Sequence, residues 1–144
     1  MCTKAEEEIS QVGTQLNALR REGAQAATLR AYKELCSRLD AICERDPHNY
    51  ALKALSAELL AVGGKFGKAR AMCETALATP GELGPSHSSL WYYTLGRVLY
   101  DEGELESAAE KLREALRQPC TPADAESVRI SLYTIMSLPM SYGV

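Results

Sequence analysis

Apolar residues recur along this chain at the spacing of one helical face, in segments separated by glycine and proline. The clearest segment begins at Leu105, and its apolar positions fall at offsets that fit a helix and not a strand. They are Leu105, Ala108, Ala109, Leu112, Ala115 and Leu116. A helix before it starts near Leu90, with Ser88 or Ser89 as its cap, and Gly103 separates the two. Residues 88–119 are therefore predicted to form an antiparallel helical hairpin.

The same pattern occurs earlier, over residues 49–80. Asn49 is the expected cap of its first helix, and Gly63-Gly64 is the turn. Five residue pairs in the two segments are each separated by 39 positions. These pairs are Gly64 and Gly103, Ala69 and Ala108, Ala76 and Ala115, Leu77 and Leu116, and Pro80 and Pro119. A shared offset across a turn and a helix indicates an internal repeat, and this period is typical of a stacked array.

Flanking segments extend the array at both ends. Residues 4–45 are expected to form a degenerate helix pair, 4–22 and 25–45, hinged near Gly23 and opened by a Thr3–Glu6 capping box. At the other end, Thr121 is the expected cap of a last helix over residues 122–137, and Pro122 lies in its first turn. The prediction is a single all-α domain covering residues 1–144.

The repeat at 88–119 resembles a tetratricopeptide repeat. The resemblance rests on an aromatic residue followed by Leu95-Gly96, on Leu99, on the turn at Gly103, and on the spacing of the second helix. The second-helix residues are Ala108, Leu112, Ala115 and a proline near the end. The repeat at 49–80 matches less closely, because it has Ser56-Ala57 where Leu-Gly is expected, and the period of 39 exceeds the usual 34. The resemblance implies a short α–α superhelix of about three hairpins plus a C-terminal helix.

Members of this family line a concave groove with the first helix of each hairpin, so the resemblance also implies a partner-binding surface. The expected groove residues are Ala54, Glu58, Ala61, Leu90, Tyr93, Arg97, Tyr100 and Asp101. Such a groove would suit an extended peptide or a helix of a partner protein. The alternative is that the aromatic side chains of this region, Trp91, Tyr92, Tyr93 and Tyr100, belong to the core.

A second function remains open, because the segment 122–137 is apolar and no partner helix follows it. Its apolar residues, together with the one that follows it, are Val128, Ile130, Leu132, Ile135, Met136 and Leu138. Ends of helical arrays need a polar cap for solubility. The chain could therefore be a structural subunit that docks through this helix, as a homo-oligomer or within a larger complex.

Composition and charge argue against several other classes of protein. The 144 residues are 46% apolar and 24% charged, with a net charge of −3, so no basic face for nucleic acid is expected. No apolar run approaches the ~20 residues that span a bilayer, and the polar start, Met1–Glu8, predicts no secretory signal.

Candidate chemistry is sparse. The five cysteines lack paired or metal-binding spacing, which predicts free thiols, a reducing compartment such as the cytoplasm, and no metal. His48 and His87 are expected in loops between hairpins, and Gly63-Gly64 lies between helices rather than after a strand. We therefore expect no catalytic residue and no cofactor, and a protein as the partner.

Overall fold

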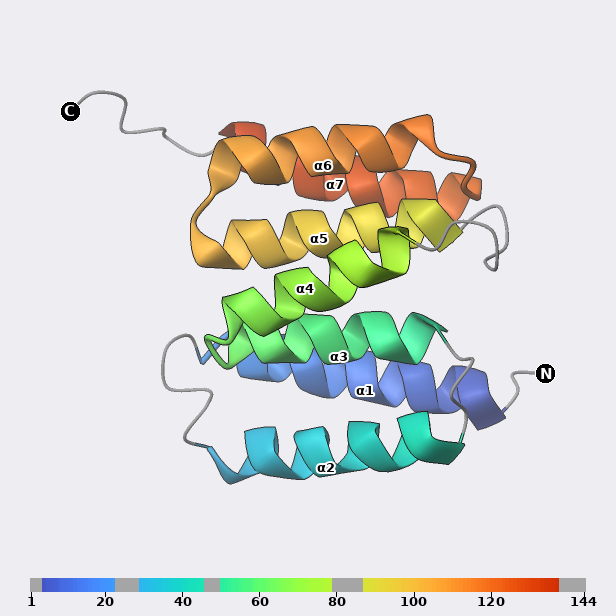
Figure 1. The fold of residues 1–144 in the computed structure, drawn as a ribbon, viewed down its shortest axis with the longest axis vertical. Helices are drawn as coiled ribbons and strands as arrows, with labels where there is room; N and C mark the ends of the chain where they lie inside the picture. The colour runs from blue at the N-terminus through green and yellow to red at the C-terminus, as the bar shows by residue number, and fades with distance from the viewer. Residues whose placement is uncertain (1–3, 23–28, 46–49, 79–86, 138–144) are drawn as a thin grey trace.

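The computed structural model describes residues 4–22, 29–45, 50–78 and 87–137. These residues form seven helices and no strand, which confirms the predicted all-α class for the part of the chain that is described. The helices are α1 (Lys4–Arg20), α2 (Arg30–Arg45), α3 (Tyr50–Val62), α4 (Phe66–Leu77), α5 (His87–Glu102), α6 (Leu105–Arg117) and α7 (Pro122–Ser137). They stack along the long axis of the molecule, with α2 at one end and α6 and α7 at the other (Figure 1).

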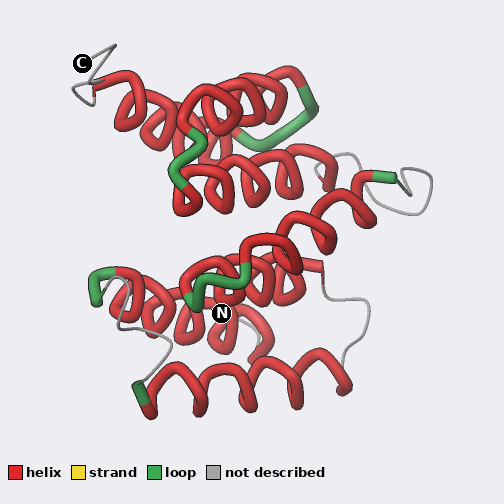
Figure 2. The backbone as a smooth tube through the Cα atoms, turned by 60° about the vertical axis from the view of Figure 1, so that its left-hand side comes forward, coloured by secondary structure: helices red, strands yellow, loops and turns green. Residues whose placement is uncertain are grey.

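The helices form two layers. The odd-numbered helices contact one another in a row, α1 to α3, α3 to α5, and α5 to α7. Each even-numbered helix packs against the odd-numbered helices that precede and follow it in the sequence. The arrangement can be followed along the tube of Figure 2. The contact between α5 and α7 is slighter than the contacts between the other odd-numbered helices.

Two hydrophobic clusters hold the layers together. The first joins α1, α2 and α3 around Val12, Leu16 and Leu39, all nearly inaccessible to solvent. The second extends from α3 to α7 and contains Trp91 and Leu112. Removal of this apolar surface from water is the main stabilising contribution to the fold.

The turns of the hairpins α3–α4 and α5–α6 have the same backbone hydrogen bonds, 39 residues apart. Lys65 N donates to Leu60 O at 2.8 Å, and Glu104 N donates to Leu99 O at 2.9 Å. These are the long bonds of a Schellman motif, which requires a left-handed residue just before the donor. Gly64 (φ +82°) and Gly103 (φ +91°) supply it, because glycine adopts this conformation without strain.

Close approach of α5 and α6 explains the small residues at their contact. A Cβ added to Gly96 would lie 2.8 Å from Leu112 Cγ and 3.3 Å from Ala108 O. The buried Ala108 and Ala115 complete this contact on α6. The small side chains let the two helices pack closely at this contact.

Several predicted details are tested by the described residues. The Thr121 cap is confirmed, because Asp124 N donates to Thr121 Oγ1 at 3.1 Å. The serine cap of the fifth helix is wrong: α5 begins at His87, and the buried Ser89 Oγ donates to Ala115 O at 3.0 Å. His87 therefore lies in a helix and not in a loop. The second helix is described from Arg30 onward, and its predicted start at residue 25 lies outside the described residues.

Other predictions lie outside the described residues. These are the Thr3–Glu6 capping box, the hinge at Gly23, the Asn49 cap, His48, and the connection that begins at Pro80.

Candidate functional site

Four of the predicted groove residues form a stripe along α5. Leu90, Tyr93, Arg97 and Tyr100 are all half-buried and recur at helical spacing, so they share the face of α5 that looks toward α7. Two hollows lie between these helices. The structure therefore brings these four residues together on one partly accessible surface.

The first hollow, of about 130 Å³, is bordered by Leu90 and Tyr93 of α5 and by Asp124 and Val128 of α7. The second, of about 180 Å³, is bordered by Arg97 and Tyr100 and by hydroxyl-bearing and apolar residues of α7. Those α7 residues are Ile130, Ser131, Thr134 and Ile135. We call the two hollows together the α5–α7 furrow.

The remaining predicted residues do not line this furrow. Ala54 and Ala61 are 2% exposed and belong to the core between α3 and its neighbours. Glu58 is 6% exposed. These three residues present almost no surface to a partner, because α1 and α5 cover α3 from both sides.

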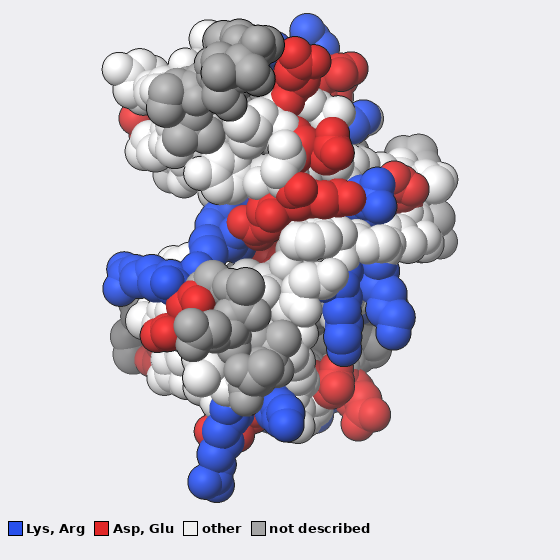
Figure 3. All heavy atoms as spheres, turned by 90° about the vertical axis from the view of Figure 1, so that its left-hand side faces the viewer, with Lys and Arg blue, Asp and Glu red and all other residues white. Residues whose placement is uncertain are grey.

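Glu58 and Asp101 instead belong to a charged cluster that joins α1, α3 and α5. Arg20 Nη1 donates to Asp101 Oδ1 at 2.6 Å, and Arg20 Nη2 lies 3.5 Å from Glu58 Oε1. Arg97 Nε lies 3.0 Å from the same Glu58 oxygen. We call Arg20, Glu58, Arg97 and Asp101 the charged cluster. Basic and acidic atoms adjoin one another near the middle of the molecule in Figure 3.

The cluster contains two guanidinium groups and two carboxylates, so its formal charges balance. The side chains of Glu58 and Asp101 are 8% and 14% exposed, and those of Arg20 and Arg97 are 22% and 27% exposed. Ion pairs removed from water to this degree interact more strongly than exposed ones, but they also lose more hydration.

Burial raises the pKa of the Glu58 carboxyl above its ordinary value, against the opposing effect of Arg97 and Arg20. For Arg97 burial acts the other way, favouring the neutral form. Glu58, Tyr93 and Asp101 outweigh it and raise the pKa of the guanidinium. Arg97 is therefore charged at every physiological pH.

Arg97 connects the charged cluster to the furrow. Its Nη1 donates to Tyr93 Oη at 3.1 Å, and its guanidinium carbon lies 5.5 Å from the centre of the Tyr93 ring. A cation at this distance is attracted to the ring. Glu58, behind Arg97, and Tyr93, beside it, thus hold the Arg97 side chain at the wall of the furrow.

Arg20 was missed by sequence reasoning. It lies in the last turn of α1, in the segment that matches the repeat least, and its partner Asp101 is 81 residues away. A basic residue in a last helical turn is usually explained by the helix dipole alone. Nothing in the local pattern distinguishes it from other surface arginines.

Among the described residues, no three or more histidine, cysteine, aspartate or glutamate side chains are grouped so that they could hold a metal ion. None of the helices in these ranges has the length and apolar run that crossing a bilayer requires. The four described cysteines, Cys36, Cys43, Cys73 and Cys120, are free thiols.

Comparisons with protein-family models, with curated proteins and with solved structures find no match to this chain. The resemblance to tetratricopeptide repeats therefore remains a prediction from the residues quoted above.

Proposed function

We propose that this chain is a protein-interaction module that holds a peptide segment or a helix of a partner protein in the α5–α7 furrow. The observation that carries the proposal is the half-buried stripe of Leu90, Tyr93, Arg97 and Tyr100 along two adjoining hollows. Tyrosine and arginine are enriched among the residues that dominate protein interfaces. The stripe contains both tyrosine and arginine, and apolar and hydroxyl-bearing residues of α7 lie across the furrow from it.

The sizes of the hollows support side-chain recognition. At about 130 and 180 Å³, each accepts one or two side chains rather than a whole ligand. The residues that border them on α5, Tyr93 and Tyr100, are seven positions apart, which corresponds to about 10 Å along a helix. Two anchors at that spacing fit a partner helix through positions i and i+7. A segment in extended conformation could span the same distance with about three residues.

The experiment compares capture of partners from lysate by the wild-type chain and by Tyr93→Ala/Tyr100→Ala. Arg97 is not the residue to change, because its removal would leave the buried Glu58 with less compensation. Tyr92→Ala is the matched control: Tyr92 is half-buried on the other side of α5, where its ring lies 6.0 Å from Lys111 Nζ. The proposal expects a partner retained by wild type and by Tyr92→Ala and lost from the double variant. Equal capture by all three folded proteins would contradict it.

A second candidate function is docking through α7 as a structural subunit. Ile130, Tyr133 and Met136 are 59%, 75% and 63% exposed, and they are the large apolar side chains most exposed among the described residues. Contiguous exposed apolar residues often mark interaction sites. Sedimentation velocity of wild type and of Tyr133→Ser distinguishes this candidate: association that the substitution abolishes would favour it, and a concentration-independent monomer would exclude self-association.

The cytoplasm is the proposed compartment. The support is the set of four free thiols, since unpaired cysteines persist best where glutathione and thioredoxin keep thiols reduced. A fluorescent fusion of the chain, imaged in cells, tests this compartment.

A further inference from the structure

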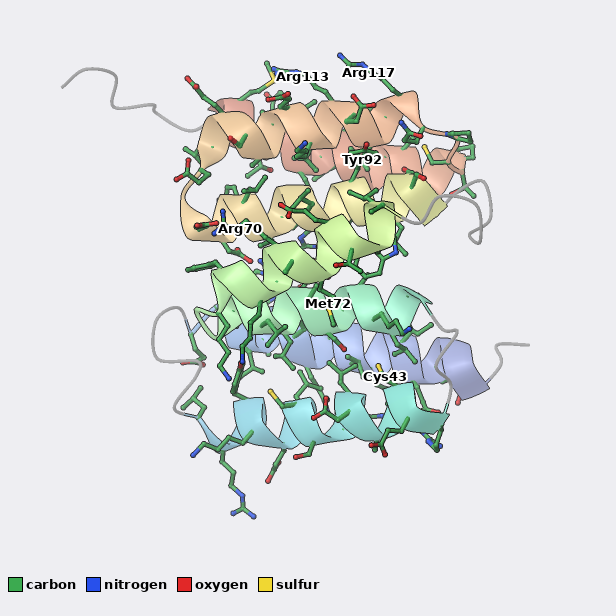
Figure 4. All side chains as sticks on the ribbon, viewed as in Figure 1. Cys43, Arg70, Met72, Tyr92, Arg113 and Arg117 are labelled. Atoms are coloured by element: carbon green, nitrogen blue, oxygen red, sulfur yellow. The ribbon has the colours of Figure 1, made fainter. Side chains whose placement is uncertain are left out.

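A cavity of about 680 Å³ lies between α2 and α4, away from the α5–α7 furrow. Its walls are Cys36, Leu39 and Cys43 of α2 and Met72 and Ala76 of α4, and Trp91 of α5 also borders it. In Figure 4, the Cys43 side chain points from α2 toward α4, and the Met72 side chain points from α4 toward α2. We call this space the α2–α4 cavity.

The cavity exists because two positions of α3 carry side chains that do not fill it. Lys53 and Ser56 border the cavity, and the residues 39 positions later are Tyr92 and Leu95. Leu95 is 4% exposed, and Tyr92 packs against the core beside α6. The hydrogen bonds from Lys65 N to Leu60 O and from Glu104 N to Leu99 O are also 39 residues apart, so this offset relates equivalent positions of the two hairpins. In the second hairpin, the ring of Tyr92 and the side chain of Leu95 fill the space that the first hairpin leaves open.

The position of α2 widens the same space. α2 packs against α3 less extensively than α4 packs against α5, and it makes little or no contact with α4. Figure 1 shows α2 standing apart from α4. Cys36 and Cys43 therefore border this space, while Cys43 Sγ also lies 3.8 Å from Ser56 Oγ of α3.

The cavity opens to solvent, and the half-buried side chains of Leu60, Met72 and Ala76 form an apolar part of its border. A ligand that removes this apolar surface from water is favoured. The Ser56 hydroxyl donates its proton to Leu52 O at 3.2 Å, and its Oγ lies 3.8 Å from Cys43 Sγ. We infer that the α2–α4 cavity is a binding site for a small apolar molecule without net charge.

The size and charge of the cavity define this ligand class. A volume of about 680 Å³ falls within the range of ~300–1,000 Å³ that small-molecule sites occupy. The charged groups on its border are one carboxylate, Asp40, and one ammonium, Lys53, which balance each other. Neither a cationic nor an anionic ligand is favoured, whereas the hydroxyl of Thr75 and the thiols suit a molecule with at most a weakly polar group.

Trp91 makes the proposal directly measurable. It is the only tryptophan in the chain, and it borders the cavity. N-phenyl-1-naphthylamine is an uncharged apolar probe that absorbs where tryptophan emits. Titration of the full chain with this probe is expected to give saturable energy transfer from Trp91, which 1-dodecanol should reverse by competition.

Two variants locate the bound probe. Lys53→Tyr/Ser56→Leu introduces the residues of the second hairpin, so it should fill the cavity and weaken probe binding at least about tenfold. Cys43→Glu places a carboxylate in the cavity wall. It should weaken binding of the apolar probe through its charge, without adding apolar side chains that fill the cavity. Circular dichroism of each variant verifies that it is folded.

Tyr133→Ser is the control, because it removes the most exposed apolar side chain of α7 and should leave probe affinity unchanged. Three results would overturn the proposal: no saturable energy transfer in wild type, wild-type affinity in both folded cavity variants, or loss of energy transfer in Tyr133→Ser. The last would assign the probe to α7.

Discussion

The Arg20 guanidinium in the last turn of α1 donates to the Asp101 carboxylate in the last turn of α5, with a 2.6 Å separation between Nη1 and Oδ1. Helix α3 lies between these two helices in the row, so the pair ties together helices that are not neighbours in the sequence. Through Glu58 the same arginine is joined to Arg97 and hence to the furrow.

Removing either partner of this pair should destabilise the fold. Arg20→Ala and Asp101→Ala are each expected to lower the free energy of unfolding by about 1–3 kcal/mol, because each leaves a largely buried charged group without its hydrogen-bond partner. A double-mutant cycle in urea should show a coupling energy of about 0.5–3 kcal/mol. Purely additive effects of the two substitutions would mean that the pair does not form in solution.

The pKa of Glu58 predicts a pH dependence of stability. Burial raises this pKa above the ordinary value of 4.5, so the folded protein keeps the proton to higher pH than the unfolded chain does. Stability should therefore fall as the pH rises from about 4.5 to the folded pKa, and this part of the dependence should be absent in Glu58→Gln. Carbon NMR of the Glu58 carboxyl measures the pKa directly. A pKa below 4.5 would show that Arg97 and Arg20 outweigh burial.

Gly96→Ala tests the close approach of α5 and α6. The added Cβ would lie 2.8 Å from Leu112 Cγ, so we expect a loss of about 1–3 kcal/mol in thermal or urea unfolding. Gly13→Ala is the matched control: it is helical, and its Cβ would meet nothing within 4 Å. This control should be stabilised by about 0.5–1 kcal/mol. Similar effects of the two substitutions would contradict the packing at Gly96.

The thiols should differ in reactivity. Cys73 is fully buried, and burial raises its pKa to about 12, so its reactive thiolate is scarce at neutral pH. Alkylation by iodoacetamide, followed by mass spectrometry, should therefore modify Cys36, Cys43 and Cys120, which are partly exposed, well before Cys73. Early modification of Cys73 in the folded protein would show that α4 opens readily.

Local signals in the sequence account for much of the fold. Helical periodicity placed Leu90, Tyr93, Arg97 and Tyr100 on one face of α5, and the turn glycines have the left-handed conformation that their place between two helices requires. The Thr121 cap is also a local feature, formed with a residue three positions later. These features depend on residues within a few positions of one another, which is why a single sequence reveals them.

Errors and omissions arise where distant residues decide the outcome. Ser89 is a poor cap because its hydroxyl is taken up by Ala115 of the next helix. Ala54 and Ala61 resemble groove residues by their place in the repeat, but α1 and α5 bury them. Arg20 belongs beside the furrow because of a partner 81 residues away. The sequence pattern carries no record of these tertiary neighbours.

The most direct test of the proposed partner site is photo-cross-linking in cells, with p-benzoylphenylalanine introduced at position 93 in one protein and at position 92 in another. Tyr93 borders the α5–α7 furrow, and Tyr92 faces Lys111 on the other side of the same helix. Binding of a partner in the furrow predicts a covalent adduct with that protein from position 93 and none from position 92. No adduct from position 93, in a protein that remains folded, would contradict binding in the furrow.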